Sequence, residues 1–240
     1  MSKLVIDIET IGENYDSLDE TTQDVLTKWI KTEHEEGSPE YSSSLAQLKE
    51  GMGFSPLTGQ IVVIGVLDVE KNVGVVYYQA PDEKNDSENQ ERENFDVENI
   101  TFKKLSEKEM LQQFWQGILK YDQVVTFNGR SFDVPFMMLR SAINGIKPSK
   151  NLMPYRYASD TNHLDLYDQL TFYGSSRKKG TLHLFCRAFG IKSPKEGEVD
   201  GQDVTRLFNE KKYLEIAKYN VGDLRATREL YLYWEKYLKF

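Results

Sequence analysis

Acidic side chains are the residues of this chain best suited to chemistry, and the first of them are Asp7 and Glu9. They come at the end of the apolar run Lys3–Ile8, which predicts a buried strand. Because side chains alternate along a strand, acids two residues apart point to one face. Buried acids on one face are unfavourable unless a cation lies between them. The pair by itself leaves two interpretations open: metal ligation, and a solvated Glu9 in the following loop.

Three further side chains could complete such a site. Asp133 follows a glycine-containing turn between a predicted strand and a predicted helix. Open α/β sheets place ligands at such junctions, although an acid there can also cap the helix. Tyr219 and Asp223 are four residues apart in a predicted helix, so they share a face one turn apart. Tyr219 could equally be a core residue, and no one of these signals specifies a function.

Strands are expected first among the elements that would position these residues. The runs Gln60–Asp68 and Val73–Gln79 predict strands joined by a short turn, and Gln123–Phe127 predicts a fourth strand. Helices dominate the second half. Ser106 and Glu109 form a capping box that begins a helix running through residue 119. Further helices are predicted near residues 133–143, 165–173, 181–189, 203–209 and 211–238. This order of elements is typical of a mixed α/β domain.

Two acidic regions interrupt this pattern. Residues 13–50 carry a net charge of −7 and residues 82–98 a net charge of −6. In the first we expect a helix, Thr21–Thr32, followed by a loop rich in Gly, Ser and Pro. The second has almost no apolar residues, so we expect a solvated insertion. One apolar side of the predicted helix is formed by Val25, Leu26, Trp29 and Ile30.

Composition limits the classes of protein that this chain can belong to. Its 240 residues, 39% of them hydrophobic, suit one domain. The net charge of −8 argues against a nucleic-acid partner, yet residues 140–195 carry +7. The single cysteine, Cys186, excludes an internal disulfide and favours a reducing compartment, so a cytoplasmic location is expected. No apolar run approaches the ~18 residues of a membrane span, and no signal peptide is expected at the start.

Taken together and in order, the candidate residues resemble the motifs of the four-carboxylate (DEDD) 3′–5′ exonucleases, tyrosine branch. The motifs are Asp7-Ile8-Glu9-Thr10, Asn128-x-x-x-Phe132-Asp133 and Tyr219-x-x-x-Asp223. The histidine branch would need a histidine five residues before Asp223, where this chain has Lys218. The chain is most similar to the predicted exonucleases related to the proofreading domain of family B DNA polymerases. The resemblance covers all but residues 13–50 and 82–98.

The resemblance implies a ribonuclease H-like α/β fold. Its mixed sheet would consist of three antiparallel strands and then parallel strands, flanked by helices, with a helical C-terminal part. Residues 1–240 would form a single exonuclease domain with polar and acidic insertions at about 13–55 and 81–100. Because the chain has no polymerase-sized extension, we expect it to act alone or with a separate replication or repair partner.

The resemblance also implies a mechanism with two Mg²⁺ or Mn²⁺ ions, because such ions prefer carboxylate oxygens and stabilise charge on a scissile phosphate. Asp7 would bridge both ions. Glu9 and Asp223 would hold the ion that generates the nucleophile, and Asp133 would serve the other ion. Tyr219 would orient the attacking water, because a tyrosine with a pKa of ~10 is a poor base near neutrality.

Contacts to the substrate are expected at a second set of residues. Thr10 would lie near the terminal nucleotide by its backbone, and Asn128 would bond the sugar–phosphate chain. Phe132 would flank a base or, by the simpler interpretation, pack under its turn. Basic residues would hold a single strand, or would only form a solvated surface. They are Arg177, Lys178, Lys179 and Lys195.

The expected function is therefore metal-dependent hydrolysis from the 3′ end of single-stranded nucleic acid, with DNA favoured, releasing 5′-mononucleotides. Two alternatives remain open at this point. One is a ribonuclease H-like endonuclease or resolvase that uses the same acids. The other is a non-catalytic nucleic-acid-binding domain that has kept the fold. The presence of all four acids and of Tyr219 argues against the second alternative.

Overall fold

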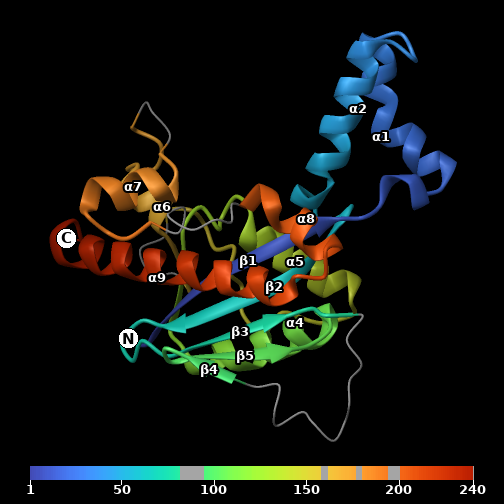
Figure 1. Ribbon diagram of the computed structural model, residues 1–240. Coiled ribbons are helices and arrows are strands. Elements are labelled where there is room, and N and C mark those ends of the chain that lie inside the picture. The colour runs from blue at the N-terminus through green and yellow to red at the C-terminus, as the bar shows by residue number, and fades with distance from the viewer. Residues whose placement is uncertain (82–94, 158–161, 177–179, 194–200, 240) are drawn as a thin grey trace, which may run out of the picture.

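A computed structural model describes residues 1–81, 95–157, 162–176, 180–193 and 201–239. Within them a seven-stranded sheet has the order β4-β5-β3-β2-β1-β6-β7 (Figure 1). Its central strands β1, β2 and β3 are antiparallel neighbours, and β6 and β7 run parallel to β1. The predicted order of antiparallel and then parallel strands is confirmed. The strands are β1 (Lys3–Gly12), β2 (Gly59–Asp68), β3 (Gly74–Tyr78), β4 (Phe95–Val97), β5 (Ile100–Lys104), β6 (Gln123–Thr126) and β7 (His163–Asp165).

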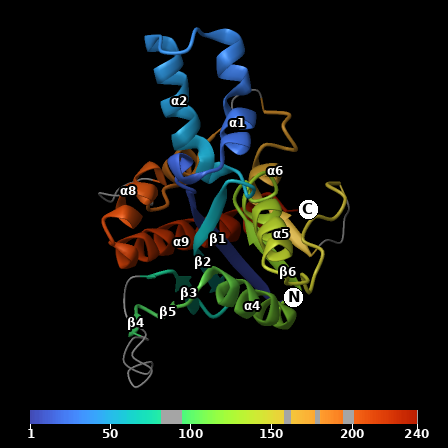
Figure 2. The same ribbon diagram turned by 90° about the vertical axis from the view of Figure 1, so that its right-hand side faces the viewer.

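Helices cover both faces of the sheet. Helices α4 (Glu107–Gly117) and α5 (Asp133–Ile143) pack on one face, and the long α9 (Tyr213–Tyr237) crosses the other (Figure 2). The face with α9 also carries α6 (Leu166–Leu170), α7 (Leu182–Phe189) and α8 (Val204–Asn209). Successive side chains of β1 point to opposite faces of the sheet and so contribute to both hydrophobic cores. Val5 packs toward α9, whereas Leu4 and Ile6 pack toward α4 and α5. None of the described helices is long and apolar enough to cross a membrane.

Local sequence signals are confirmed at several helix ends. The capping box of Ser106 and Glu109 begins α4 as predicted, with both reciprocal hydrogen bonds present. Helix α5 spans the predicted residues, and α9 differs from its prediction by two residues at the start and one at the end. These signals depend on neighbours within one helical turn, so a sequence can show them without knowledge of the fold.

The largest difference from expectation lies in the first acidic region. The predicted loop after α1 (Glu20–Glu33) is a second helix, α2 (Pro39–Gly51), which begins with Ser38 as N-cap and a proline in the first turn. The two helices form an arm that projects from the sheet (Figure 1). The predicted apolar side of α1 is wrong, because Val25 and Trp29 are 69% and 46% exposed and only Ile30 of that set is buried. Because α1 projects from the sheet with α2, its apolar side chains have few core residues to pack against.

Some strands of the structure were not predicted, and β1 is longer than predicted. Residues 95–104, partly assigned to an insertion, form β4 and β5, and β5 pairs in parallel with β3. Residues 163–165 form β7, a strand that was not predicted, and the helix predicted near residues 165–173 follows it as α6 (Leu166–Leu170). Strand β1 continues to Gly12, so Asp7 and Glu9 lie inside it and not at its end. Pairing with β2 extends β1 past its apolar run, where the hydrophobic pattern alone gives no signal. Residues 82–94 of the second acidic region lie outside the described residues.

Candidate active site

Strand β1 directs two carboxylates toward α9. Asp7 and Glu9 share the α9 face with Val5, while Ile6 and Ile8 point into the opposite core. A register shift between β1 and β2 follows directly after Glu9. The predicted shared face of the two acids therefore agrees with the structure, although they lie in a central strand of the sheet.

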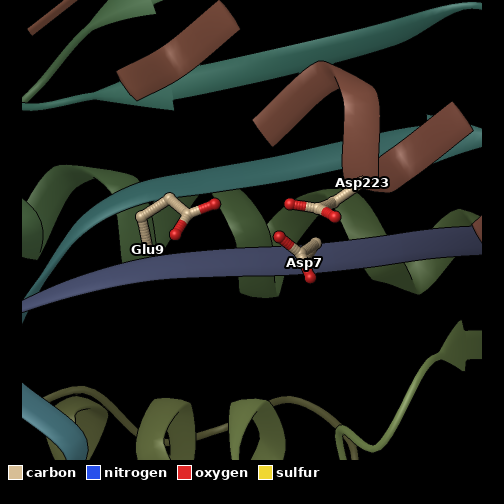
Figure 3. Close-up of side chains that lie close together, drawn as sticks. All are labelled: Asp7, Glu9 and Asp223. Carbon is tan, nitrogen blue, oxygen red and sulfur yellow. The ribbon is translucent and has the colours of Figure 1, made fainter. Parts of the chain in front are cut away.

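Helix α9 brings a third carboxylate to the same place. One carboxylate oxygen from each of Asp7, Glu9 and Asp223 lies within 4.8 Å of the others (Figure 3). Asp223 comes from the opposite end of the sequence, and its side chain points toward that of Asp7 (Figure 3). Three converging carboxylates are an oxygen donor set suited to a hard divalent cation.

A glycine of β2 permits the close approach of α9. Gly65 is paired in register with Asp7, and a Cβ at this position would lie 1.8 Å from Asn220 Oδ1 and 2.7 Å from Leu224 Cδ1. Any larger residue would therefore displace the side chains of Asn220 and Leu224 or move α9. Gly65 was not among the predicted site residues, because a glycine in a strand is not by itself a sign of a distant contact.

Asn220 of α9 is a second residue that the sequence analysis missed. Its side chain is fully buried, and Nδ2 donates to Asp7 Oδ2 at 2.7 Å and to Glu9 Oε1 at 3.3 Å. Its Oδ1 atom is buried and has no hydrogen-bond partner among the described residues. An asparagine on the buried side of a helix, next to Tyr219, was the available signal, because buried amides need partners.

Asp133 reaches the site from the other side of β1. Strand β6 pairs with β1 only along Lys3–Val5, and beyond that point Asp133 Oδ1 accepts a hydrogen bond from the backbone N–H of Ile8 at 3.1 Å. Asp133 also lines, together with Asp7 and the other two acids, a cleft of about 910 Å³. It is not one of the three residues whose oxygens converge within 4.8 Å. All four predicted acids thus border one cleft, with Asp133 set apart from the other three.

Burial makes these acids hold protons more tightly. Desolvation, and next the charge of Asp223, raises the pKa of Asp7 and of Glu9 well above the usual range for carboxyl groups. Burial raises the pKa of Asp133 to about 7. Within the described part of the chain, no basic side chain pairs with Asp7 or Glu9. Buried acids such as Asp7 and Glu9, which have no basic partner among the described residues, fit the binding of divalent metal ions.

Tyr219 lies one helical turn before Asp223, as predicted. Burial raises the pKa of Tyr219 far above 10, and the charges of Asp223 and Glu9 raise it further. The hydroxyl also forms a hydrogen bond with Asp223. Tyr219 therefore keeps its proton near neutral pH, so it can orient a water molecule but cannot act as a base.

The turn before α5 is held by Asp165. This buried carboxylate accepts hydrogen bonds from the backbone N–H groups of Asn128, at 2.8 Å, and Arg130, at 2.9 Å, and it also caps α6. Asn128 has a left-handed backbone, with φ of 63°, and lines the cleft. Such strained residues persist only where their surroundings hold them, so Asp165 is a positioning residue for this turn.

Of the remaining residues predicted to contact the substrate, only Phe132 and Thr10 lie in the described part of the chain. Phe132 lines the cleft and packs against Phe136 and Phe54, with ring centroids 5.6 and 6.3 Å away. The hydroxyl of Thr10 donates to the carbonyl of Gly53 at 2.7 Å, which ties β1 to the end of the helical arm. The predicted basic residues Arg177, Lys178, Lys179 and Lys195 lie outside the described residues.

Comparison with known proteins gives polymerases as relatives. Over 140 residues the chain is 29% identical to a DNA polymerase of Desulfurococcus sp. (strain Tok), covering 52% of this chain and 18% of the polymerase. Over 73 residues it is 34% identical to DNA polymerase 1 of Sulfurisphaera ohwakuensis, covering 28% of this chain and 8% of that protein. The chain therefore spans less than a fifth of either relative.

The fold agrees with a solved polymerase structure. The family B DNA polymerase from the hyperthermophilic archaeon Pyrobaculum calidifontis superposes with a TM-score of 0.58 at 17% identity. The superposition covers 98% of this chain and 24% of the polymerase. Residues 84–239, which include Asp133, Tyr219 and Asp223, match one family profile. The chain belongs to the family of predicted 3′–5′ exonucleases related to the exonuclease domain of PolB.

Proposed function

We propose that this protein is a metal-dependent 3′–5′ exonuclease that removes 5′-mononucleotides from single-stranded nucleic acid, preferentially DNA. The observation that carries the proposal is the convergence of carboxylate oxygens from Asp7, Glu9 and Asp223 within 4.8 Å in a cleft that Asp133 also lines. Membership of an exonuclease-related family and similarity to two DNA polymerases support both the reaction and the choice of DNA.

The proposal assigns two divalent ions, Mg²⁺ or Mn²⁺, to these acids. Asp7, Glu9 and Asp223 would hold them, and Asp133 would contribute from its side of the cleft. When bound, such ions supply positive charge to the scissile phosphate and lower the pKa of a water molecule. The raised pKa values of Asp7 and Glu9 support this assignment, because a bound cation would stabilise the ionised form that burial disfavours.

The protein's own groups would orient the reactants. Asn220 donates to Asp7 and Glu9 and so limits the rotation of both carboxylates. Tyr219 keeps its proton and would orient the attacking water by its hydroxyl. Asn128 and Phe132, at the cleft wall, would contact the last nucleotides, with Thr10 close by through its backbone. Because Asp7 and Asp223, which share one site, lie 216 positions apart in the sequence, we propose that residues 1–240 form one exonuclease domain.

The net charge of −8 does not oppose this function. Residues 13–50 contribute −7, and their two helices form the arm that projects from the sheet (Figure 2). The four acids of the cleft contribute a further −4, which two divalent ions would neutralise. Binding of single strands should then weaken as salt rises, because phosphate contacts release counterions.

A direct test uses 5′-labelled DNA and RNA oligonucleotides with the wild-type protein and Asp7→Ala, each with and without Mg²⁺. We expect a ladder of products shortened stepwise from the 3′ end, only with metal, only with the wild type, and faster on DNA. Internal cuts would instead support an endonuclease. Absence of metal-dependent cleavage of either substrate would overturn the proposed function.

A further inference from the structure

An exposed group of aromatic side chains lies beside the cleft and takes no part in the reaction proposed above. It consists of Tyr155, Tyr157, Phe172 and Tyr173, called here the aromatic patch, with exposures of 74%, 58%, 60% and 37%. Three of the rings contact one another in a row. The Tyr155 and Tyr157 centroids are 5.7 Å apart, and the Tyr157 and Tyr173 centroids are 5.1 Å apart. Large aromatic side chains gathered in water are typical of binding surfaces.

The backbone under the patch is held in an unfavourable conformation. Phe172 and Tyr173 are consecutive non-glycine residues with left-handed φ values of 51° and 56°. The N–H of Tyr173 donates to the carbonyl of Asp168 at 2.7 Å, and its hydroxyl accepts from Gln169 at 2.9 Å. The turn after α6 therefore holds both rings at the surface, although their burial would be favourable.

The patch is continuous with the cleft that holds the acids. Thr171 and Gly174, on either side of the two rings, line that cleft. Arg156, between the two other tyrosines in sequence, lines the cleft and also a second cavity of about 740 Å³, which Tyr157 and Tyr173 line too. An extended ligand that leaves the cleft over the turn after α6 would therefore contact the aromatic rings.

Positive charge accompanies the rings. Arg156 is bound by the buried carboxylate of Asp168, with its Nε donating at 2.9 Å, and its side chain is still 44% exposed. Lys3, Arg130 and Lys239 also line the second cavity, where both lysines form ion pairs with Glu235. A surface that offers aromatic rings and cations side by side suits bases and phosphates rather than an apolar protein surface.

We propose that the aromatic patch binds the single strand beyond its 3′-terminal nucleotides by stacking its bases, while Arg156 and its neighbours attract the backbone. The inference rests on the proposed function, because it assumes that the 3′ end of the strand lies in the cleft. Stacking on aromatic rings tolerates any base sequence. The patch would therefore add affinity for long strands without adding sequence preference and without touching the reacting phosphate.

The test compares binding of fluorescent oligothymidylates of three and twelve nucleotides in EDTA, where no cleavage occurs. The double variant Tyr157→Ala/Tyr173→Ala should bind the twelve-mer about 10-fold more weakly than wild type and the three-mer equally well. Tyr157→Phe/Tyr173→Phe should restore twelve-mer affinity, because the rings are retained. A twelve-mer whose upstream nucleotides are abasic should bind the wild type as weakly as the normal twelve-mer binds the alanine variant.

Two controls separate stacking from other effects. Trp29→Ala removes an aromatic side chain with 46% exposure from α1, away from the patch, and should leave both affinities unchanged. The salt dependence of binding should be the same in wild type and alanine variant, because no phosphate contact is removed. With Mg²⁺, the alanine variant should show a raised KM for the twelve-mer and an unchanged kcat.

The outcomes are distinguishable from those of the proposed function. Unchanged twelve-mer affinity in the alanine variant would overturn the aromatic patch as a binding surface, even if the protein proves to be an exonuclease. Length-dependent binding that needs the rings would support the patch even if no cleavage is found. A wild-type protein that binds neither oligonucleotide would overturn the inference.

Discussion

Asn220 and Gly65 fit together so closely that Asn220 Oδ1 lies 1.8 Å from the place of a Cβ on residue 65. On the other side of the same amide, Nδ2 donates to Asp7 Oδ2 at 2.7 Å. The amide of Asn220 thus lies between Gly65 of β2 and Asp7 of β1, on the helix that also carries Asp223.

Asn220→Ala should weaken metal binding by about 10- to 100-fold, as is common for residues that hold metal ligands in place. The reason is that Asp7 and Glu9 lose the donor that limits their rotation. Calorimetric titration of the metal-free protein with Mn²⁺ measures this directly. Asn144→Ala is the matched control. It also removes an amide that donates to a carboxylate, that of Glu107 at 3.1 Å, but this pair does not line the cleft. Equal Mn²⁺ affinity in wild type and Asn220→Ala would contradict the prediction.

Gly65→Ala should lower both stability and metal affinity, because the new methyl group would collide with Asn220 and with Leu224. The expected loss of unfolding free energy is about 1–3 kcal/mol, measured by urea denaturation. Adding Asn220→Ala in the same chain should restore part of that stability, since it removes one of the colliding groups. The control is Gly117→Ala in α4, where a Cβ would meet nothing within 4 Å. Independent, additive effects of Gly65→Ala and Asn220→Ala would show that the two residues are not coupled.

Tyr219→Phe should reduce kcat by about 10- to 100-fold while leaving Mn²⁺ affinity nearly unchanged, because it removes only the hydroxyl beside Asp223. Asp7→Ala should abolish activity and weaken metal binding as well. Single-turnover cleavage of a labelled strand, together with Mn²⁺ titration, measures both effects. A Tyr219→Phe protein as inactive as Asp7→Ala, with metal still bound, would mean that the hydroxyl does more than orient water.

The stability of the metal-free protein should fall as the pH rises. The pKa of Asp133 is about 7 in the folded protein, against an ordinary value near 4, so folding favours its protonated form. The resulting stabilisation is complete below pH 4 and is lost as the pH rises through 7. In EDTA, we expect Tm to drop by about 3 °C or more between pH 5 and pH 8. Mg²⁺ should recover most of the loss at pH 8, because it binds the ionised acids.

Asp133→Asn is the variant that isolates this effect. It keeps an oxygen that can accept from the N–H of Ile8 and removes the titrating group. Its Tm in EDTA should therefore depend less on pH than that of the wild type. A wild-type Tm that stays constant from pH 5 to pH 8 in EDTA would contradict the assigned direction of the pKa shift.

Residue spacing and helix caps, which involve only neighbours in sequence, predict many of the local features of this fold. The two-residue spacing of Asp7 and Glu9 implies a shared face in any strand, and the four-residue spacing of Tyr219 and Asp223 implies a shared face in any helix. The capping box that begins α4 and the limits of α5 depend on neighbours a few residues away. For this reason the shared faces of the acids and the ends of several helices were predictable from the residues, whereas the order of antiparallel and parallel strands came only from the family resemblance.

Packing between distant segments decided the rest. The apolar side assigned to α1 was wrong because α1 packs in an arm with α2, and a helix of mixed polarity does not reveal its partner. Asn220 and Gly65 escaped prediction because each is ordinary in its own element, and only their contact, between residues 155 positions apart in the sequence, gives them a role.

Residue types and their spacing along the chain identify the four acids, most of the strands and helices that hold them, and the family that they resemble. The distances between those acids depend instead on how the strands and helices pack. Asp7 and Asn220 are 213 positions apart, and their 2.7 Å hydrogen bond exists because a glycine in β2 lets α9 lie against the sheet. Short-range periodicity places side chains on faces, whereas a distance between faces depends on the volumes of all the residues packed between them.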